Sequence, residues 1–276
     1  MRDILLQANS HPEPTPAWAI ERTAGLAARF DAKLSLGVCQ VHIPPVSNWL
    51  ANSLLNIDGV IAGENNKSAD NARALVEAFT ARVPADRQGE AFVLDCPGMV
   101  THWQLAVRAR TYDLCVVPHY GHDQSAAMAE GLAFEAGRPV LLLPESAGSA
   151  LNFERIAIAW DGSRVAARAL ADALPLARIA KSVSIVRITG EKEMRYAAAP
   201  EDAVRHLKLH GIEAEAVDVP LESRDAAATL QAYCDRAERD LLVMGAFGHS
   251  RAREFVLGGV TRSILDAPGL AVFMSH

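Results

Sequence analysis

The feature that most constrains this chain is a series of short apolar runs separated by longer helical segments. In the first half the apolar runs lie at 4–6, 34–41, 91–94, 114–117 and 140–143. Near-continuous apolar runs of this size are typical of strands buried on both faces, as in a parallel sheet. The Ala-rich segments between them have helical spacing, so the pattern predicts βαβ units with right-handed crossovers.

The same order of elements then starts again. Further runs lie at 155–160, 183–188, 214–219, 240–244 and 268–273, and Asp240 at the start of the fourth run matches Asp113 in the first half. Five strands and four helices therefore occur twice, which indicates a duplicated domain. The segment 146–150 has the small, flexible composition of a linker, so we predict domains at 1–145 and 151–276.

Composition narrows the class of protein. The 276 residues are 50% hydrophobic, enough for two filled cores, and the charged residues are mixed along the chain with a net charge of −6. We expect no nucleic-acid partner and no membrane partner, because neither a concentrated basic face nor a membrane-length apolar run is present. Four scattered cysteines and the absence of a signal-peptide pattern favour the cytoplasm.

A glycine-rich segment follows the fourth predicted strand of the second half. Its residues of interest are Met244, Gly245, Gly248, Gly258, Gly259, Val260 and Thr261. Glycines leave backbone N–H groups open to a ligand, and N–H groups that lead into a helix attract anions. Ligands of doubly wound sheets bind beyond the carboxyl ends of the strands. The spacing by itself leaves two interpretations open, a phosphate-binding loop or glycines that only shape turns.

The end of the first strand in the second half carries a carboxylate, Asp161, after Trp160. Its oxygens could accept hydrogen bonds from an adenine amino group or from ribose hydroxyls. Alternatively, Asp161 or Ser163 could cap the helix that follows, which requires no ligand. Both roles are compatible.

The glycines at 245, 248 and 258 have the Gly-x2-Gly-x9-Gly spacing of the ATP-binding universal stress proteins, and the whole chain resembles a tandem pair of such domains. The resemblance implies two doubly wound α/β domains, each a five-stranded parallel sheet of order 3-2-1-4-5 flanked by helices. It also implies ATP as the ligand, with Mg²⁺ as a candidate companion ion. One position departs from the family pattern, since Gly259 stands where those proteins carry Ser or Thr.

The resemblance adds Ile188, which would face the adenine from the end of the second strand. The complete set of predicted nucleotide-binding residues is Asp161, Ile188, Met244, Gly245, Gly248, Gly258, Gly259, Val260 and Thr261.

The first half has lost this loop. Pro118 replaces the first glycine and has no N–H to donate, while Leu132 and Phe134 replace Gly259 and Thr261. Asn9 stands in the place of Asp161. We therefore predict a degenerate first domain that binds no nucleotide.

The sequence gives little support for metal binding or for catalysis. The sequence has no HExxH or CxxC spacing around His119, His122, His42 and Cys39, so we predict no metal site. It has neither a Gly-x-Ser-x-Gly elbow nor a Walker A lysine, so we predict no catalytic residues. Arg251, Arg253 and Arg262 are candidates for balancing phosphate charge, or are solvated surface residues.

These observations predict a tandem universal stress protein that binds ATP in its second half and has a regulatory role. The alternatives are a slow ATP hydrolase or nucleotidyl-transfer relative of the same fold, and an interaction protein without a ligand. The apolar last strands, 140–143 and 270–274, predict an intramolecular pseudo-dimer, which could associate further into a homo-oligomer. The extra residues at 43–66 form a predicted loop that is either functional or a plain surface excursion.

Overall fold

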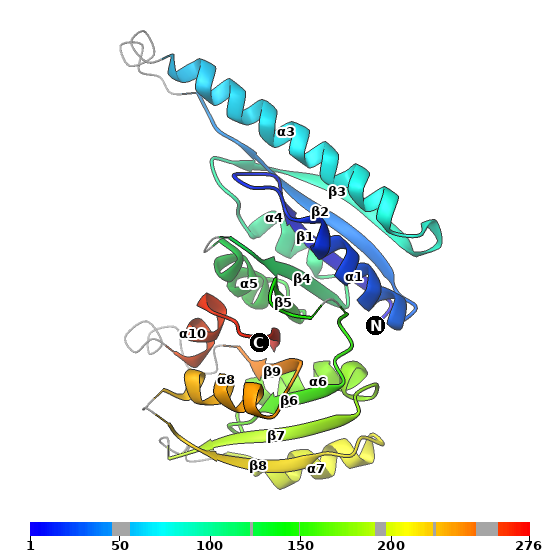
Figure 1. Cartoon of the computed structure of the whole chain (residues 1–276), viewed down its shortest axis with the longest axis vertical. Helices are drawn as coiled ribbons and strands as arrows, with labels where there is room; N and C mark the ends of the chain where they lie inside the picture. Colours follow the sequence, from blue (N-terminus) through cyan, green and yellow to red (C-terminus); the bar gives the residue numbers. More distant parts are fainter. Residues whose placement is uncertain (46–55, 122–123, 149, 191–196, 223–224, 247–258) are drawn as a thin grey trace. The chain divides into compact units, whose positions relative to one another are not determined.

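The computed structural model describes residues 1–45, 56–121, 124–148, 150–190, 197–222, 225–246 and 259–276. The chain folds into two compact units, Met1–Pro118 and His119–His276, and most of their elements are labelled in Figure 1. Among the described helices, none combines the length and the hydrophobicity that crossing a bilayer requires.

The first unit contains a parallel sheet with the strand order β3-β2-β1-β4. Its strands are β1 (Asp3–Asn9), β2 (Lys33–His42), β3 (Gln88–Pro97) and β4 (Leu114–His119). Helices α1 (Ala17–Arg29) and α3 (Ile57–Arg82) contact each other and β2, whereas α4 (Trp103–Ala109) lies behind these strands in Figure 1. A short 3₁₀ turn, η1 (Ala85–Arg87), leads into β3.

The second unit contains six strands in the order β5-β10-β9-β6-β7-β8. They are β5 (Val140–Pro144), β6 (Arg155–Ala159), β7 (Ser182–Thr189), β8 (Glu215–Pro220), β9 (Leu241–Gly245) and β10 (Ala271–Ser275). The helices of this unit are α5 (Gln124–Glu135), α6 (Arg164–Ala177), α7 (Pro200–Leu209), α8 (Ala226–Arg236) and α10 (Val260–Asp266). The five strands of the second sequence half run parallel in the predicted order 3-2-1-4-5, so this part of the fold prediction is confirmed.

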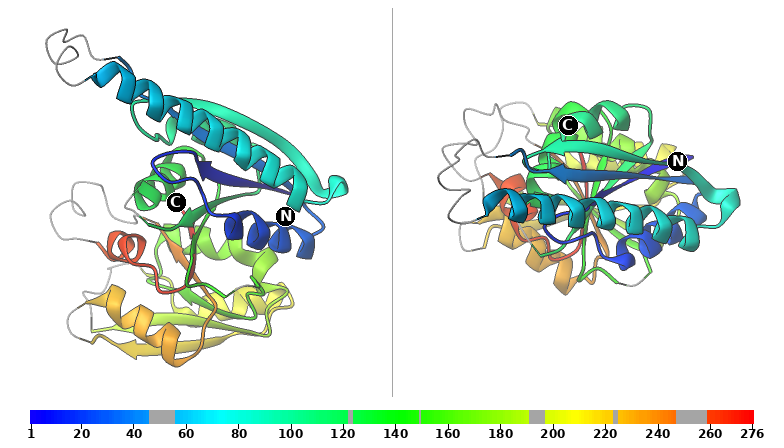
Figure 2. Two further views of the ribbon diagram at one scale, coloured as in Figure 1. Left: turned by 45° about the horizontal axis from the view of Figure 1, so that its top comes forward. Right: turned by 90° about the horizontal axis from the view of Figure 1, so that it is seen from above.

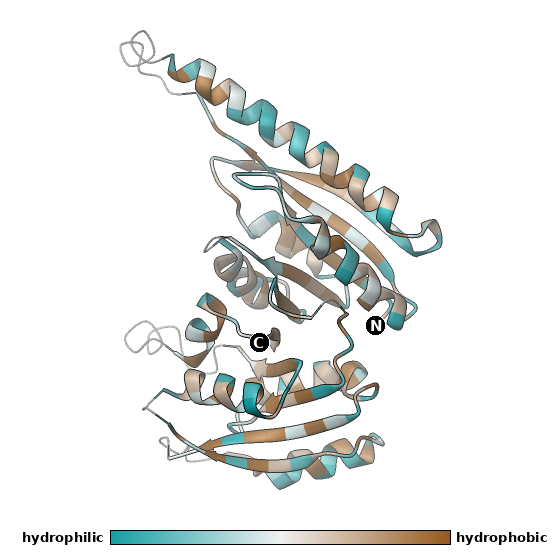
Figure 3. Ribbon diagram, in the orientation of Figure 1, coloured by the Kyte–Doolittle hydropathy of each residue, from teal (hydrophilic) through white to brown (hydrophobic). Residues whose placement is uncertain are grey.

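The inner strands are buried on both faces, as the apolar runs predict. Ile4, Leu5 and Leu6 are consecutive residues of β1 and are all 0% exposed, although their side chains alternate between the two faces of the sheet. Figure 3 shows the corresponding hydrophobic colour along the central strands of each unit, and Figure 2 shows the helices that cover them.

The last strands of the two sequence halves pair with each other, as predicted. β10 runs antiparallel to β5, with Phe273 opposite Leu141, and every residue of both strands is buried. Their preceding helices also meet, since Arg262 of α10 forms an ion pair with Glu130 of α5 at 3.1 Å. The pairing covers two apolar edges that would otherwise favour association with other chains.

The compact units therefore do not divide the chain where the sequence repeat does. Because β5 pairs with β10 and α5 contacts α10, residues after Pro118 are grouped with the second unit. The predicted domain boundary at 146–150 stays a prediction.

An equivalent hydrogen-bonded contact occurs within each half, at the amino ends of its strands. In the first half the Oδ2 atom of Asp113 accepts hydrogen bonds from the backbone N–H groups of Arg2, at 2.5 Å, and Asp3, at 3.2 Å. In the second half the carboxylate of Asp240 accepts from Glu154 and Arg155, at 2.7 and 2.9 Å. This repeated contact supports the alignment of the two halves made from the sequence.

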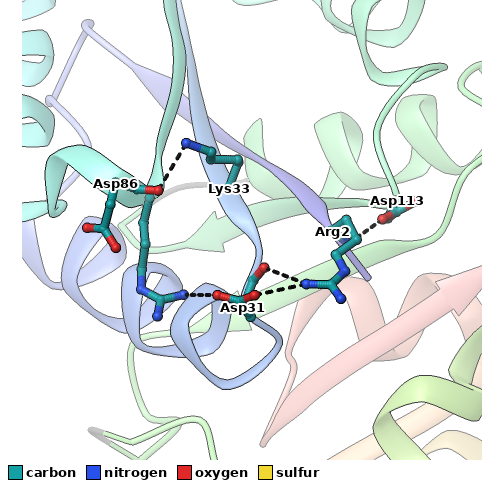
Figure 4. A network of polar contacts seen from close by, with 6 residues as sticks. Arg2, Asp31, Lys33, Asp86 and Asp113 are labelled. Carbon is teal, nitrogen blue, oxygen red and sulfur yellow. Dashed lines mark hydrogen bonds and ion pairs between the residues drawn. The ribbon is translucent and has the colours of Figure 1, made fainter.

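Figure 4 shows this region of the first unit. Asp31 receives hydrogen bonds from the guanidinium groups of Arg2 and Arg87, and Lys33 donates to the carbonyl oxygen of Asp86 at 3.0 Å. These contacts connect the turns that lead into β1, β2 and β3. They lie at the edge of the sheet opposite the one where ligands of this fold class bind.

The predicted loop at 43–66 is wrong in its second part. Helix α3 already begins at Ile57, and Asn65 on this helix exchanges two hydrogen bonds with the backbone of Ile43, at 2.7 and 3.0 Å. The early turns of α3 thus hold the end of β2 in place.

Candidate functional site

The predicted site residues of the second half gather at one edge of its sheet. β7 and β9 lie on opposite sides of β6 and run parallel to it, so the carboxyl ends of all three strands share this edge. Asp161 follows β6, Ile188 lies near the end of β7, and Gly245 ends β9. The chain leaves β6 toward one side and β9 toward the other, which makes this position the topological switch point of the sheet.

Gly245 has a packing role that does not depend on a ligand. A Cβ atom at this position would lie 2.5 Å from the carbonyl carbon of Val165 and 2.6 Å from the backbone nitrogen of Ala166. The first turn of α6 therefore approaches the end of β9 so closely that only glycine fits. Its neighbour Met244 is 4% exposed and belongs to the core.

Of the two residues considered as caps of the following helix, Ser163 takes this role and Asp161 holds the turn before it. The Oδ1 atom of Asp161 accepts a hydrogen bond from the backbone N–H of Ser163, at 2.9 Å. The Ser163 hydroxyl then accepts from the N–H of Ala166, at 3.2 Å, and so caps α6. Asp161 remains exposed at the edge of the sheet, where its carboxylate can also meet a ligand.

A second segment lies against this loop, which the sequence analysis did not foresee. The indole N–H of Trp160 donates to the carbonyl oxygen of Ala198, at 2.9 Å, and the N–H of Ala198 donates to the carbonyl oxygen of Gly162, at 3.3 Å. Gly162 has a φ of +74°, and a Cβ there would lie 2.5 Å from the Ala198 nitrogen. The glycine after Asp161 was the available signal for this close approach.

The far end of the glycine-rich segment is the start of α10. Gly259 occupies the N-cap position of this helix without a side-chain cap, and Thr261 is 6% exposed. Val260 begins the helix. Gly248, Gly258, Arg251 and Arg253 lie outside the described residues.

Arg262 is engaged in ion pairs with two carboxylates. Its guanidinium forms ion pairs with Glu130 of α5, at 3.1 Å, and with Asp266 one helical turn later, at 3.0 Å. The hydrogen bond to Asp266 raises the pKa of Arg262 above its usual value, so the charge is stabilised within this network. Of the two suggested roles, surface ion pairing fits Arg262.

The equivalent edge of the first half is occupied by the protein's own polar groups. Asn9 is 8% exposed, and its side-chain oxygen accepts a hydrogen bond from Gln7 at 2.5 Å. The next residue, Ser10, contacts the Ser68 hydroxyl of α3 at 2.7 Å, and both are buried. His11 contacts Glu64 of the same helix at 3.2 Å. That the first half binds no nucleotide stays a prediction.

The replaced loop residues of the first half also serve the core. Pro118 is buried in β4 and Leu132 is 0% exposed in α5. The ring of Phe134 packs on His276 with 4.7 Å between centroids.

The described residues offer little for covalent or metal-dependent catalysis. No group of three or more His, Cys, Asp or Glu side chains converges in the described parts of the chain. Burial raises the pKa of Cys115 and Cys234 to about 12, which keeps these thiols protonated and unreactive. A hydrogen bond from Cys39 lowers the pKa of Cys96 to about 7, but this thiol is only 1% exposed.

Comparison with known protein families finds a match in the second half of the chain. The model of the universal stress protein family matches residues 152–268, which include β6 to β9 and the glycine-rich segment. No curated protein matches the chain significantly.

Solved structures extend the likeness beyond the second half. A universal stress protein from Archaeoglobus fulgidus DSM 4304 is 15% identical, with a TM-score of 0.70 over 98% of this chain and 95% of its own. A functionally unknown protein from Pseudomonas aeruginosa PAO1 is also 15% identical, with a TM-score of 0.53 over 100% of this chain and 92% of its own.

A universal stress protein solved in complex with cAMP is 20% identical but covers only 45% of this chain, with a TM-score of 0.35. A likeness of that size does not transfer the ligand to this chain. The family match and the full-length structural likeness agree on one conclusion. Residues 152–268 match the universal stress protein family, and the chain has the fold of a solved universal stress protein along nearly its whole length.

Proposed function

We propose that this protein binds one adenine nucleotide, ATP, at the carboxyl edge of its second half and acts as a regulatory stress-response module. One observation carries the proposal. Gly245, the first glycine of the family's spacing, ends β9 at the switch point of the sheet, and the neighbouring strand β6 leads to the exposed carboxylate of Asp161. A ligand in that position meets donors on one side and acceptors on the other.

The contributions of the individual groups follow from their chemistry. Backbone N–H groups of the glycine-rich segment donate to phosphate oxygens, which is the recognition that glycines permit. Asp161 accepts from the adenine amino group or from ribose hydroxyls while it keeps its bond to Ser163. Ile188, half-buried near the end of β7, offers an apolar surface to the base. Mg²⁺ would accompany the phosphates as a counter-ion.

Gly259 sets the expected strength of binding. Where related proteins offer a hydroxyl, this chain offers only the backbone at the N-cap of α10. One side-chain hydrogen bond to phosphate is therefore lost, which corresponds to about 1 kcal/mol and roughly a fivefold weaker complex.

Native mass spectrometry of the freshly purified full chain, followed by calorimetric titration with ATP and Mg²⁺, tests the proposal. We expect one nucleotide per chain, because Asn9, Pro118, Leu132 and Phe134 exclude a site in the first half. Gly248→Val and Gly258→Val should abolish binding by blocking approach to the backbone. Gly63→Val is the matched control, since a Cβ at this exposed helical glycine meets nothing within 4 Å.

The remaining outcomes would replace the proposal. Two equivalent sites per chain would mean that the first half is functional. No detectable binding of ATP, ADP or AMP would favour the ligand-free interaction protein. Turnover above about 1 s⁻¹, the lower end of ordinary enzymes, would favour an ATP hydrolase.

A further inference from the structure

Two exposed histidines lie four residues apart at the carboxyl end of α7, His206 within the helix and His210 at its C-cap. The imidazole rings of His206 and His210 have centroids 4.7 Å apart at an interplanar angle of 64°, and both residues are exposed. The same helix carries the buried Ala203 and Leu207, and α7 contacts β7 and β8. The backbone beneath the two rings is therefore held by the sheet.

We propose that His206 and His210 form a surface site for a late first-row divalent cation, namely Cu²⁺, Zn²⁺ or Ni²⁺. Histidines at positions i and i+4 of a helix can direct one nitrogen each to a common point, which is how the two histidines of the helical H-E-x-x-H pattern hold zinc. Imidazole is a good ligand for these cations and a poor one for Mg²⁺ or Ca²⁺. Cu²⁺ should bind most tightly among the three, in line with the general order of stability.

The neighbouring side chains indicate a site with two protein ligands. Asp202, one turn before His206, forms an ion pair with Arg205 at 3.1 Å and is therefore engaged. The described parts of the chain also contain no convergent group of three or more metal-ligating side chains. Water would complete the coordination sphere. An exposed cation with open positions exchanges readily and can accept a further ligand from outside the chain.

The proposed cation site and the proposed nucleotide site use different groups, so they can be tested independently. It uses imidazole nitrogens on a helix, whereas the nucleotide site relies on backbone N–H groups and a carboxylate at the edge of the sheet. Loss of both histidines should therefore leave ATP binding unchanged.

Calorimetric titration of the untagged full chain with CuCl₂ in a non-coordinating buffer tests the site, with electron paramagnetic resonance to count the nitrogen ligands. We expect one Cu²⁺ bound by two nitrogens in the wild type. His206→Gln and His210→Gln should each remove one nitrogen and weaken binding by about tenfold or more, because the second imidazole acts at a high local concentration. His42→Gln, a change of another exposed histidine at the end of β2, is the matched control and should have no effect.

Thermal unfolding separates loss of the ligand from loss of the fold. Cu²⁺ should raise the melting temperature of the wild type and of His42→Gln but not that of the double variant H206Q/H210Q. Without metal the wild type and all the variants should melt together, since the substituted side chains are exposed. A double variant that binds Cu²⁺ as tightly as the wild type would overturn the proposal. A wild type that shows no coordinated nitrogen would do so as well.

Discussion

Gly245→Ala is the substitution for which the structure makes the sharpest prediction. The added Cβ would lie 2.5 Å from the carbonyl carbon of Val165 and 2.6 Å from the nitrogen of Ala166. Both are backbone atoms in the first turn of α6, and neither can rotate away as a side chain would. The start of α6 must therefore move away from the end of β9, although Ser163 caps this helix and Ala169 and Ala173 are buried along it.

Overpacking of this kind costs about 1–3 kcal/mol. A unit of this size loses roughly 2–4 °C of melting temperature for each kcal/mol, so a cost of about 2 kcal/mol lowers the transition by about 4–8 °C. The assay is thermal unfolding of the full chain without nucleotide, followed by circular dichroism.

Gly25→Ala provides the matched control. Gly25 is an exposed glycine within α1, and a Cβ there meets nothing within 4 Å. The same chemical change should stabilise this helix by about 0.5–1 kcal/mol, because alanine loses less backbone entropy than glycine. If Gly245→Ala melts like the wild type, the packing argument is wrong. If it also loses ATP binding at an unchanged melting temperature, the glycine serves only the ligand.

Three further changes test other parts of the argument. Asp161→Asn should weaken ATP binding by about tenfold without changing stability, because the amide oxygen can still accept from Ser163 but a neutral acceptor bonds less strongly; calorimetry with a parallel thermal melt checks both. Burial, followed by the charges of Asp113 and Glu90, raises the pKa of Asp3, so its ionised form destabilises the fold above the ordinary carboxyl range. Asp3→Asn should consequently raise the melting temperature at pH 7 and give no gain near pH 3, where the aspartate is protonated in both states; an equal gain at both pH values would refute this. Fragment 151–276 lacks β5 and should self-associate through β10, whereas fragment 119–276 keeps β5 and should stay monomeric; light scattering that finds both fragments monomeric would contradict the role of this pair.

The sequence predicted the fold well where its signals are local. Consecutive buried residues such as Ile4, Leu5 and Leu6 identify inner strands without reference to any distant residue, and the repeat of this pattern shows the duplication. The beginning of α3 was missed because its first turns carry two glycines, Gly59 and Gly63, which are poor helix formers. Of this 26-residue helix only Ser68, Ala72, Leu75 and Phe79 are buried, and all four lie in its later part.

At the site, the sequence identified which residues lie at the ligand edge but not what else they do. The spacing of the glycines is visible in the chain, whereas the contact between Gly245 and α6 joins residues about 80 positions apart and depends on tertiary packing. The same holds for Gly162, whose need for a positive φ arises from a segment some 36 residues later. Sequence patterns therefore located the ligand-binding edge of the sheet. Packing between elements explains some of the glycines there that the sequence motif alone attributes to ligand binding.

Asp113 and Asp240 make equivalent contacts in the two halves, and this has a consequence for how the sequence of such a chain can evolve. Both halves keep the same carboxylate at the amino ends of their strands, while their carboxyl ends differ, with Asn9 and Pro118 in one and Asp161 and Gly245 in the other. The amino ends of the strands thus maintain the fold, whereas the residues at their carboxyl ends can change and so gain or lose the ability to bind a ligand. A library of variants confined to the carboxyl edge should yield many folded proteins with altered ligands, whereas one confined to the amino edge should yield mostly unfolded ones.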